Sequence, residues 1–191
     1  WEFNSVGFPQ SNWPTAAQAG AAFQHAFRSF EDVPGGSIQF NRLPDRSGAP
    51  ASNDGRAEVF LCTDETNDLF GSNISGFYAA TYFVRNTTTG AMLDADVEFN
   101  GDPDTFTWAV TGPPAPGGSS DLEVTLLHEG LHAVGGGHPV YLYAAVWPTG
   151  RFPEDLMHDR CLAPDDRALL RTLYPEAPLL GTITGQVNLS S

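Results

Sequence analysis

The chain has 191 residues, of which 41% are hydrophobic and 12% aromatic; this suffices for one domain with a buried core and argues against a disordered chain. Its formal net charge is −14 with only nine Lys and Arg, which excludes a nucleic-acid partner because phosphate contacts need clustered basic residues. No segment approaches the roughly 18 consecutive apolar residues that a membrane span requires.

The first half of the chain predicts one helix followed by strands. The helix is expected at residues 15–30, where Ala and Phe recur at helical spacing after Pro14. Polar loops rich in Asp, Asn, Ser and Gly separate the segments that follow. Five of these segments have the composition and alternation of strands, at residues 37–40, 57–62, 77–84, 92–99 and, more briefly, 106–110.

The second half predicts two helices. Residues 111–118 read T-G-P-P-A-P-G-G and are expected to connect the halves without regular structure. Ser120 and Glu123 have the spacing of a capping box, which predicts the start of a helix that ends before Gly135. A last helix is expected at about residues 165–173.

One motif in the second of these helices is typical of a metal site. Residues 128–138 read H-E-G-L-H-A-V-G-G-G-H. Residues four apart on a helix are separated by about 40° and about 6 Å, so His128 and His132 project from one face and can bind one zinc ion. Gly135 allows the backbone to leave the helix with positive φ, which would bring His138 back as the third ligand.

The motif also supplies a base. Three imidazoles leave one zinc position for water, and Glu129 is predicted to accept the proton of that water as general base. The alternative is a helix with two core histidines, which would bury two imidazoles and a carboxylate without a metal at a high energetic cost. Three His, one Glu and one Gly at this spacing occur by chance on the order of once in millions of positions, which favours the metal site.

The eleven residues from His128 to His138 resemble the extended zinc signature of the metzincins, a clan of zinc endopeptidases. The resemblance implies a tight turn bearing a methionine beneath the zinc, and Met157 lies at a suitable distance for this Met-turn, with ordinary core packing as the alternative. Residues 90–108 and 165–175 are similar to bacterial matrixin-like peptidases. Pro139, directly after the third His, instead resembles the residue that serralysin-like enzymes carry at this position.

This resemblance implies an α+β fold with a twisted, mixed five-stranded sheet, an active-site helix, a backing helix, and a smaller C-terminal lobe with the Met-turn and a closing helix. Residues 1–178 would form the catalytic domain, with an upper lobe at about 1–138 and a lower lobe at about 139–178. Residues 179–191 would be a tail or the stump of a further domain. An extended protein or peptide substrate would pair with an edge strand at 77–84.

Two cysteines, Cys62 and Cys161, lie far apart in the sequence. A disulfide between them is the simplest interpretation and would indicate an oxidising compartment, with two buried thiols as the alternative. The first residues, W-E-F-N, do not resemble a signal peptide, so we expect a secreted monomer whose targeting segment has been removed.

Further sites are less sharply defined. Six oxygen-bearing loop residues could bind Ca²⁺, as the resemblance suggests, or could be solvated: Asp64, Glu65, Asp68, Asn73, Asp102 and Asp104. His25 is interpreted as structural, and a structural zinc is not expected.

A thermolysin-type peptidase would need a distal Glu as third ligand, which His138 disfavours. A non-catalytic, secreted zinc-binding interaction module is the remaining alternative, although it would have no need of Glu129.

Overall fold

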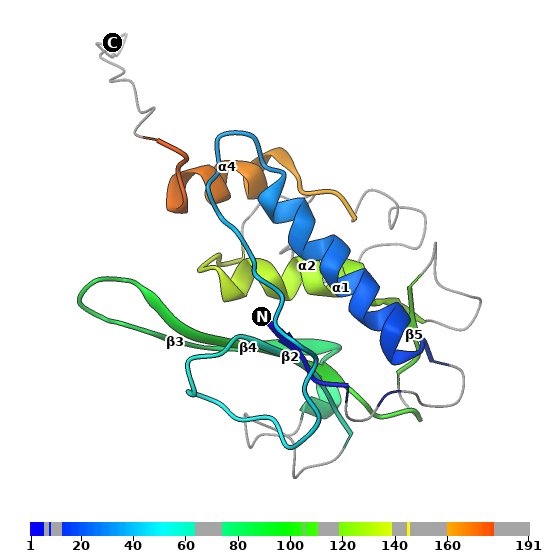
Figure 1. Cartoon of the computed structure of the whole chain (residues 1–191). Coiled ribbons are helices and arrows are strands. Elements are labelled where there is room, and N and C mark those ends of the chain that lie inside the picture. Colours follow the sequence, from blue (N-terminus) through cyan, green and yellow to red (C-terminus); the bar gives the residue numbers. More distant parts are fainter. Residues whose placement is uncertain are drawn as a thin grey trace, which may run out of the picture.

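The computed structural model describes residues 1–5, 8, 13–63, 74–104, 106–110, 119–138, 145 and 160–177. These residues form an α+β fold around a mixed four-stranded sheet in the order β1-β2-β4-β3 (Figure 1). Its strands are β1 (Glu2–Phe3), β2 (Glu58–Cys62), β3 (Ala79–Arg85) and β4 (Met92–Asn100). The first two strands and β4 run parallel, whereas β3 pairs antiparallel with β4 at one edge.

The described residues also form three α-helices, α1 (Ala16–Glu31), α2 (Leu122–Ala133) and α4 (Pro164–Leu173), and a short 3₁₀ helix η1 (Ile74–Gly76). Both α1 and α2 lie on the same side of the sheet (Figure 1). The core fills the space between them. Its largest fully buried side chains include Phe3, Phe23, Phe30, Phe99, Trp108, Leu126, Leu127 and Leu131.

Helix α1 begins where the sequence supplies a capping box. The hydroxyl of Thr15 accepts from the backbone N–H of Gln18 at 3.3 Å, and the side-chain oxygen of Gln18 accepts from the backbone N–H of Thr15 at 2.9 Å. Its apolar stripe then packs on the sheet through Phe23, whose ring lies 5.1 Å from that of Phe99. The helix predicted at residues 15–30 is therefore confirmed to within one residue.

Helix α2 begins one residue later than its sequence indicates. Ser120 lies in the strand β6 (Ser120–Asp121), which pairs in parallel with β5 (Trp108–Ala109). Asp121 therefore caps α2 instead, accepting from the N–H of Val124 at 3.1 Å. The predicted Ser120 cap is wrong, but the helix itself is confirmed.

Over the part of the chain that the structure describes, the main sheet has four strands where five were predicted. Residues 37–40 are not a strand, because their backbone donors have other partners: the N–H of Ser37 donates to the carbonyl of Tyr174 and that of Phe40 to the carboxylate of Glu31. Nor does β5 join this sheet, since it pairs with β6. In this sheet β1, which pairs with β2, was not predicted from the sequence, and neither was β6 beside β5.

The predicted disulfide between Cys62 and Cys161 is wrong, because the structure has no such bond. Side chains alternate between the two faces of a strand, and Cys62 packs with Phe60 and Ile74 while its neighbour Leu61 joins the core under the helices. Cys62 is thus directed away from the helix layer. Cys161 is exposed beside Arg160, whose guanidinium pairs with Asp121 at the start of α2. The alternative of two buried thiols is also wrong for Cys161.

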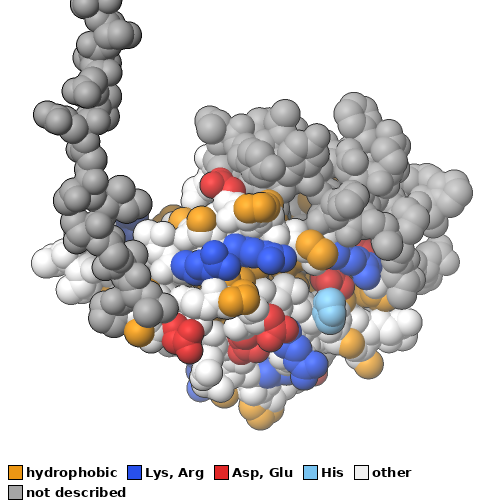
Figure 2. Space-filling model, turned by 90° about the horizontal axis from the view of Figure 1, so that it is seen from above, with side chains coloured by type: hydrophobic (Ala, Val, Ile, Leu, Met, Phe, Trp, Pro, Cys, Tyr) orange, Lys and Arg blue, Asp and Glu red, His pale blue; other side chains and the backbone are white. Residues whose placement is uncertain are grey.

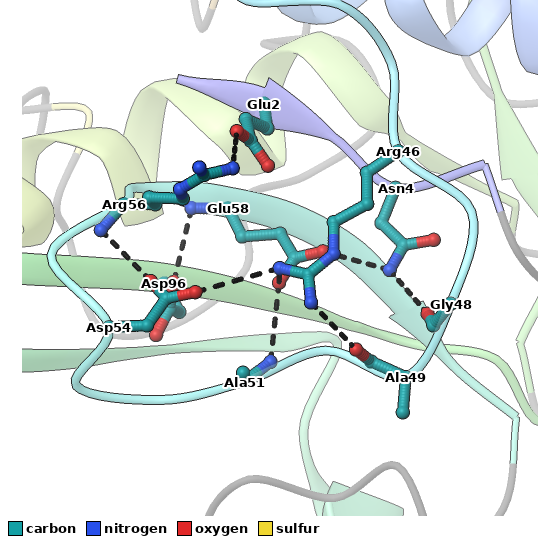
Figure 3. A network of polar contacts seen from close by, with 10 residues as sticks. All are labelled: Glu2, Asn4, Arg46, Gly48, Ala49, Ala51, Asp54, Arg56, Glu58 and Asp96. Atoms are coloured by element: carbon teal, nitrogen blue, oxygen red, sulfur yellow. Dashed lines mark hydrogen bonds and ion pairs between the residues drawn. The ribbon is translucent and has the colours of Figure 1, made fainter.

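The sheet face opposite the helices carries a network of buried polar side chains and partly exposed arginines (Figure 3). Glu58 of β2 accepts from the side-chain amide of Asn4 at 2.8 Å and pairs with Arg46 at 3.6 Å. Its backbone N–H donates to Asp96 of β4 at 3.1 Å, and Arg56 pairs with Glu2 of β1 at 2.7 Å. This network ties the loop that precedes β2 to the sheet.

The outer surface of the helix layer is mixed in character. Figure 2 shows basic, acidic and apolar side chains intermixed on this face. Among the described residues, no helix is long and apolar enough to cross a membrane.

Candidate metal centre

Helix α2 and the turn that ends it bring three histidines together. His128 and His132 project from α2, and the chain turns at Gly135, which has a φ of +99°. Gly136 then donates to the carbonyl of Leu131 at 2.7 Å. A Cβ on Gly136 would lie only 2.7 Å from that carbonyl oxygen, so a residue without a side chain is required where the chain folds back towards His138.

The ring nitrogens of these histidines converge. Nε2 of His132 lies 3.3 Å from Nε2 of His128 and 3.1 Å from Nε2 of His138. The potential ligand atoms all lie within 4.8 Å of one another. Nitrogen ligands at about 2.1 Å from a tetrahedral zinc ion are about 3.4 Å apart. The three histidines therefore form a group that could hold a metal ion such as zinc.

Hydrogen bonds on the far side of two rings set the protonation of this group. Nδ1 of His128 lies 2.9 Å from the carbonyl oxygen of Ala145, and Nδ1 of His132 lies 2.9 Å from that of Gly136. Since a carbonyl oxygen only accepts, each Nδ1 carries the hydrogen and each neutral ring presents an Nε2 lone pair to the group. Converging lone pairs cannot satisfy one another, whereas one cation satisfies all of them, so the residues fit a metal.

The surroundings also favour neutral rings. Burial lowers the pKa of His128 to about 4, and the neighbouring His132 adds to this shift. The pKa of His138 is lowered by burial and again by His132. At neutral pH the imidazoles of His128 and His138 are consequently in the uncharged form that binds metal ions.

A buried carboxylate lies beside the three-histidine group. Glu129 is only 7% exposed, and its Oε1 lies 4.0 Å from Nε2 of His128. Its Oε2 accepts from the hydroxyl of Thr81 on β3 at 2.6 Å. Burial raises the pKa of Glu129, and the hydrogen bond from Thr81 acts in the opposite direction.

A chain of hydrogen bonds, which the sequence did not predict, connects Asp166 of α4 to His128 through the peptide of Ala145. Asp166 is 2% exposed, and its Oδ2 accepts from the backbone N–H groups of Ala145 and Ala163, both at 2.8 Å. The carbonyl of the same Ala145 accepts from His128. Asp166 thus fixes the peptide that orients the first histidine. The only sequence signal for this role is an acidic residue in the first turn of α4.

Within the described part of the chain, none of the other residues singled out from the sequence joins this group. Met157 lies outside the described residues, as do four of the proposed calcium ligands, Asp64, Glu65, Asp68 and Asn73. Of the other two, Asp102 accepts from the backbone N–H of Asp104 within their own turn. Among the described residues, the three histidines are the one group of three or more His, Cys, Asp or Glu with converging ligand atoms. His25 lies apart from it and contacts Glu123 at 2.6 Å.

Comparison with known proteins does not extend this assignment. No protein-family model matches the chain, and a search of curated proteins found no match either.

Proposed function

We propose that the chain is a zinc-dependent endopeptidase in which His128, His132 and His138 hold one zinc ion and Glu129 is the general base. The observation that carries the proposal is the convergence of three Nε2 atoms next to a buried carboxylate that is not itself part of the group. When bound, zinc would supply Lewis-acid chemistry, lowering the pKa of a water to about 7 and polarising a carbonyl.

Glu129 handles the proton of the reaction. Its carboxylate accepts a proton from the attacking water as the oxygen–carbon bond forms at the peptide carbonyl, and it delivers that proton to the nitrogen as the carbon–nitrogen bond breaks. Burial, which raises the pKa of Glu129, favours a group that holds a proton between these two steps. A site that only stored zinc would gain nothing from a buried carboxylate in this position.

The resemblance of residues 128–138 to the metzincin signature supports a peptide as substrate. On this proposal, Met157 is the methionine of the Met-turn, and an extended substrate pairs with the edge strand β3. Secretion also remains part of the proposal, although it no longer has the support of a disulfide.

Metal content and cleavage of an unfolded protein test this function together. The purified chain should bind one zinc ion, cleave the substrate, lose activity with a chelator and regain it with added zinc. Glu129→Gln should retain zinc but lose about 10²- to 10⁴-fold in kcat, the usual contribution of a general base. A zinc-loaded chain that cleaves no peptide bond would favour the interaction module, and full activity in Glu129→Gln would refute the assigned base.

A further inference from the structure

A hydroxyl from the sheet holds the carboxylate beside the three histidines. Thr81 lies in the middle of β3, where its backbone is paired with Val97 of β4. Its Oγ1 lies 2.6 Å from Oε2 of Glu129 and 2.9 Å from the backbone carbonyl oxygen of the same residue. Among the described residues, Thr81 supplies the only hydrogen bond to the Glu129 side chain.

The two carboxylate oxygens of Glu129 consequently differ. Oε2 is held by Thr81, whereas Oε1 lies 4.0 Å from Nε2 of His128 and faces the three-histidine group. A glutamate side chain has several rotatable bonds, and burying it with a single defined orientation requires a fixed donor. The hydroxyl leaves one oxygen of the carboxylate available on the side where a proton has to be collected.

The donor is rigid because of where it stands. Thr is β-branched, so its χ1 angle is restricted, and its backbone position is set by the pairing of β3 with β4. The orientation of Glu129 is therefore determined from outside its own helix, by the edge strand of the sheet. A donor on α2 would move with Glu129 and could not provide an independent reference.

From this geometry we propose that Thr81 is a positioning residue for Glu129, its hydroxyl fixing Oε2 so that Oε1 faces the metal centre. The inference rests on the proposed function and adds a residue of β3 to it. Misplacement of a reacting group by about 1 Å costs on the order of 10²-fold in rate, so the loss of this hydroxyl should appear in kcat.

Two substitutions separate the hydroxyl of Thr81 from its shape. Thr81→Val keeps the β-branched shape without the hydroxyl and should lower kcat by about 10- to 100-fold, with KM and zinc affinity nearly unchanged. Thr81→Ser keeps the hydroxyl and should stay close to wild type. Thr125→Val is the matched control, since the Thr125 hydroxyl donates only to the backbone carbonyl of Asp121, at 2.9 Å, and its loss should leave kcat unchanged.

A second readout needs neither metal nor substrate. In the metal-free protein with ¹³C-labelled glutamate, the infrared carboxylate stretch of Glu129 is obtained by subtracting the spectrum of Glu129→Gln. This band should shift in Thr81→Val and keep its wild-type position in Thr81→Ser and Thr125→Val.

The outcomes distinguish this inference from the function on which it rests. An unshifted Glu129 band in Thr81→Val, or an equal loss of kcat in Thr81→Ser and Thr81→Val, would overturn the positioning role while leaving an active peptidase. A wild-type chain that binds zinc and cleaves nothing would overturn the proposed function, and the role of Thr81 with it.

Discussion

At the scale of single residues, the site depends on three neutral imidazoles that present lone pairs to a common point. Two of the rings are fixed by carbonyl acceptors at Nδ1, each at 2.9 Å. His138 is more exposed and comes from beyond the helix, so its contribution to metal binding is the most direct test of the turn at Gly135.

His138→Ala should lower zinc affinity by more than about 100-fold, because even residues that only support a metal ligand contribute 10- to 100-fold. Competition with a chromophoric chelator measures this affinity. His25→Ala is the control, since His25 contacts Glu123 in the first turn of α2 and is not part of the three-histidine group, so its removal should leave zinc affinity unchanged. Equal affinities in the two variants would mean that His138 is not a ligand.

Asp166 offers a test of how α4 supports the first histidine. Asp166→Ala removes the acceptor of the Ala145 N–H and should weaken zinc binding by about 10- to 100-fold, as the loss of an indirect support usually does. Asp165→Ala removes a neighbouring acidic residue of the same helical turn that is exposed, so it controls for the charge at the start of α4. If both variants bind zinc with the same affinity, the hydrogen bond from Ala145 to Asp166 does not contribute to zinc binding.

At the scale of elements, the helices could be predicted and part of the sheet could not. Local sequence alone indicates helix α1, through the Thr15 capping box and a periodic apolar face. The failed strand at residues 37–40 and the missed β1 depend on partners far along the chain, Tyr174 for Ser37 and Ala57 for Glu2. Pairing with such distant partners cannot be predicted from a short window of sequence.

The site, too, has one part that local sequence predicts and another that depends on distant contacts. The three histidines and Glu129 lie within eleven consecutive residues, so helical geometry and one glycine suffice to predict them. Thr81 lies 48 residues from Glu129, and Asp166 lies 21 residues from Ala145. Their roles follow from the packing of β3 against α2 and from the hydrogen bond of Asp166 in α4 to Ala145, which the motif does not determine.

The turn after α2 yields a prediction of its own. Gly136→Ala should lower both the free energy of unfolding, by about 1–3 kcal/mol, and zinc affinity, because its Cβ would clash with the carbonyl of Leu131 and with the side chain of Leu169. Denaturant unfolding and zinc titration measure these effects. Gly137→Ala is the matched control, since nothing lies within 4 Å of a Cβ at that position; an equal loss there would rule out the steric explanation.

At the scale of the whole molecule, the two faces of the sheet differ in the acidic side chains that they bury. One face packs apolar side chains under the helices, and the other buries acidic ones, including Glu58, Asp94 and Asp96. Burial, with the nearby charge of Asp94, raises the pKa of Asp96 from 3.8 to about 7. Burial also raises the pKa of Glu58. This acidic face makes folding sensitive to pH.

Asp96 should make the protein less stable as pH rises. Between pH 3.8 and about 7 the folded chain holds a proton at Asp96 that the unfolded chain has released, so its stabilising contribution is complete below this interval and is lost through it. At about 1.4 kcal/mol per unit of pKa shift, the effect amounts to a few kcal/mol. Asp96→Asn can keep the acceptor for Glu58 without the charge, and should be more stable than wild type at pH 8.

Urea unfolding of the metal-free protein at pH 4.5 and pH 8 measures this difference. The exposed Asp104→Asn serves as control and should follow the pH dependence of wild type. If Asp96→Asn also follows wild type at both pH values, Asp96 titrates at its ordinary pKa and does not make folding sensitive to pH.

The proposed function requires His128, His132 and His138 to hold one zinc ion through their Nε2 atoms. Anomalous diffraction from crystals of the zinc-loaded chain, recorded on both sides of the zinc absorption edge, tests it most directly. We expect one strong peak, about 2.1 Å from each of the three Nε2 atoms, as this zinc site requires. A peak at other residues, or a loaded chain whose three rings point apart with no metal between them, would contradict it.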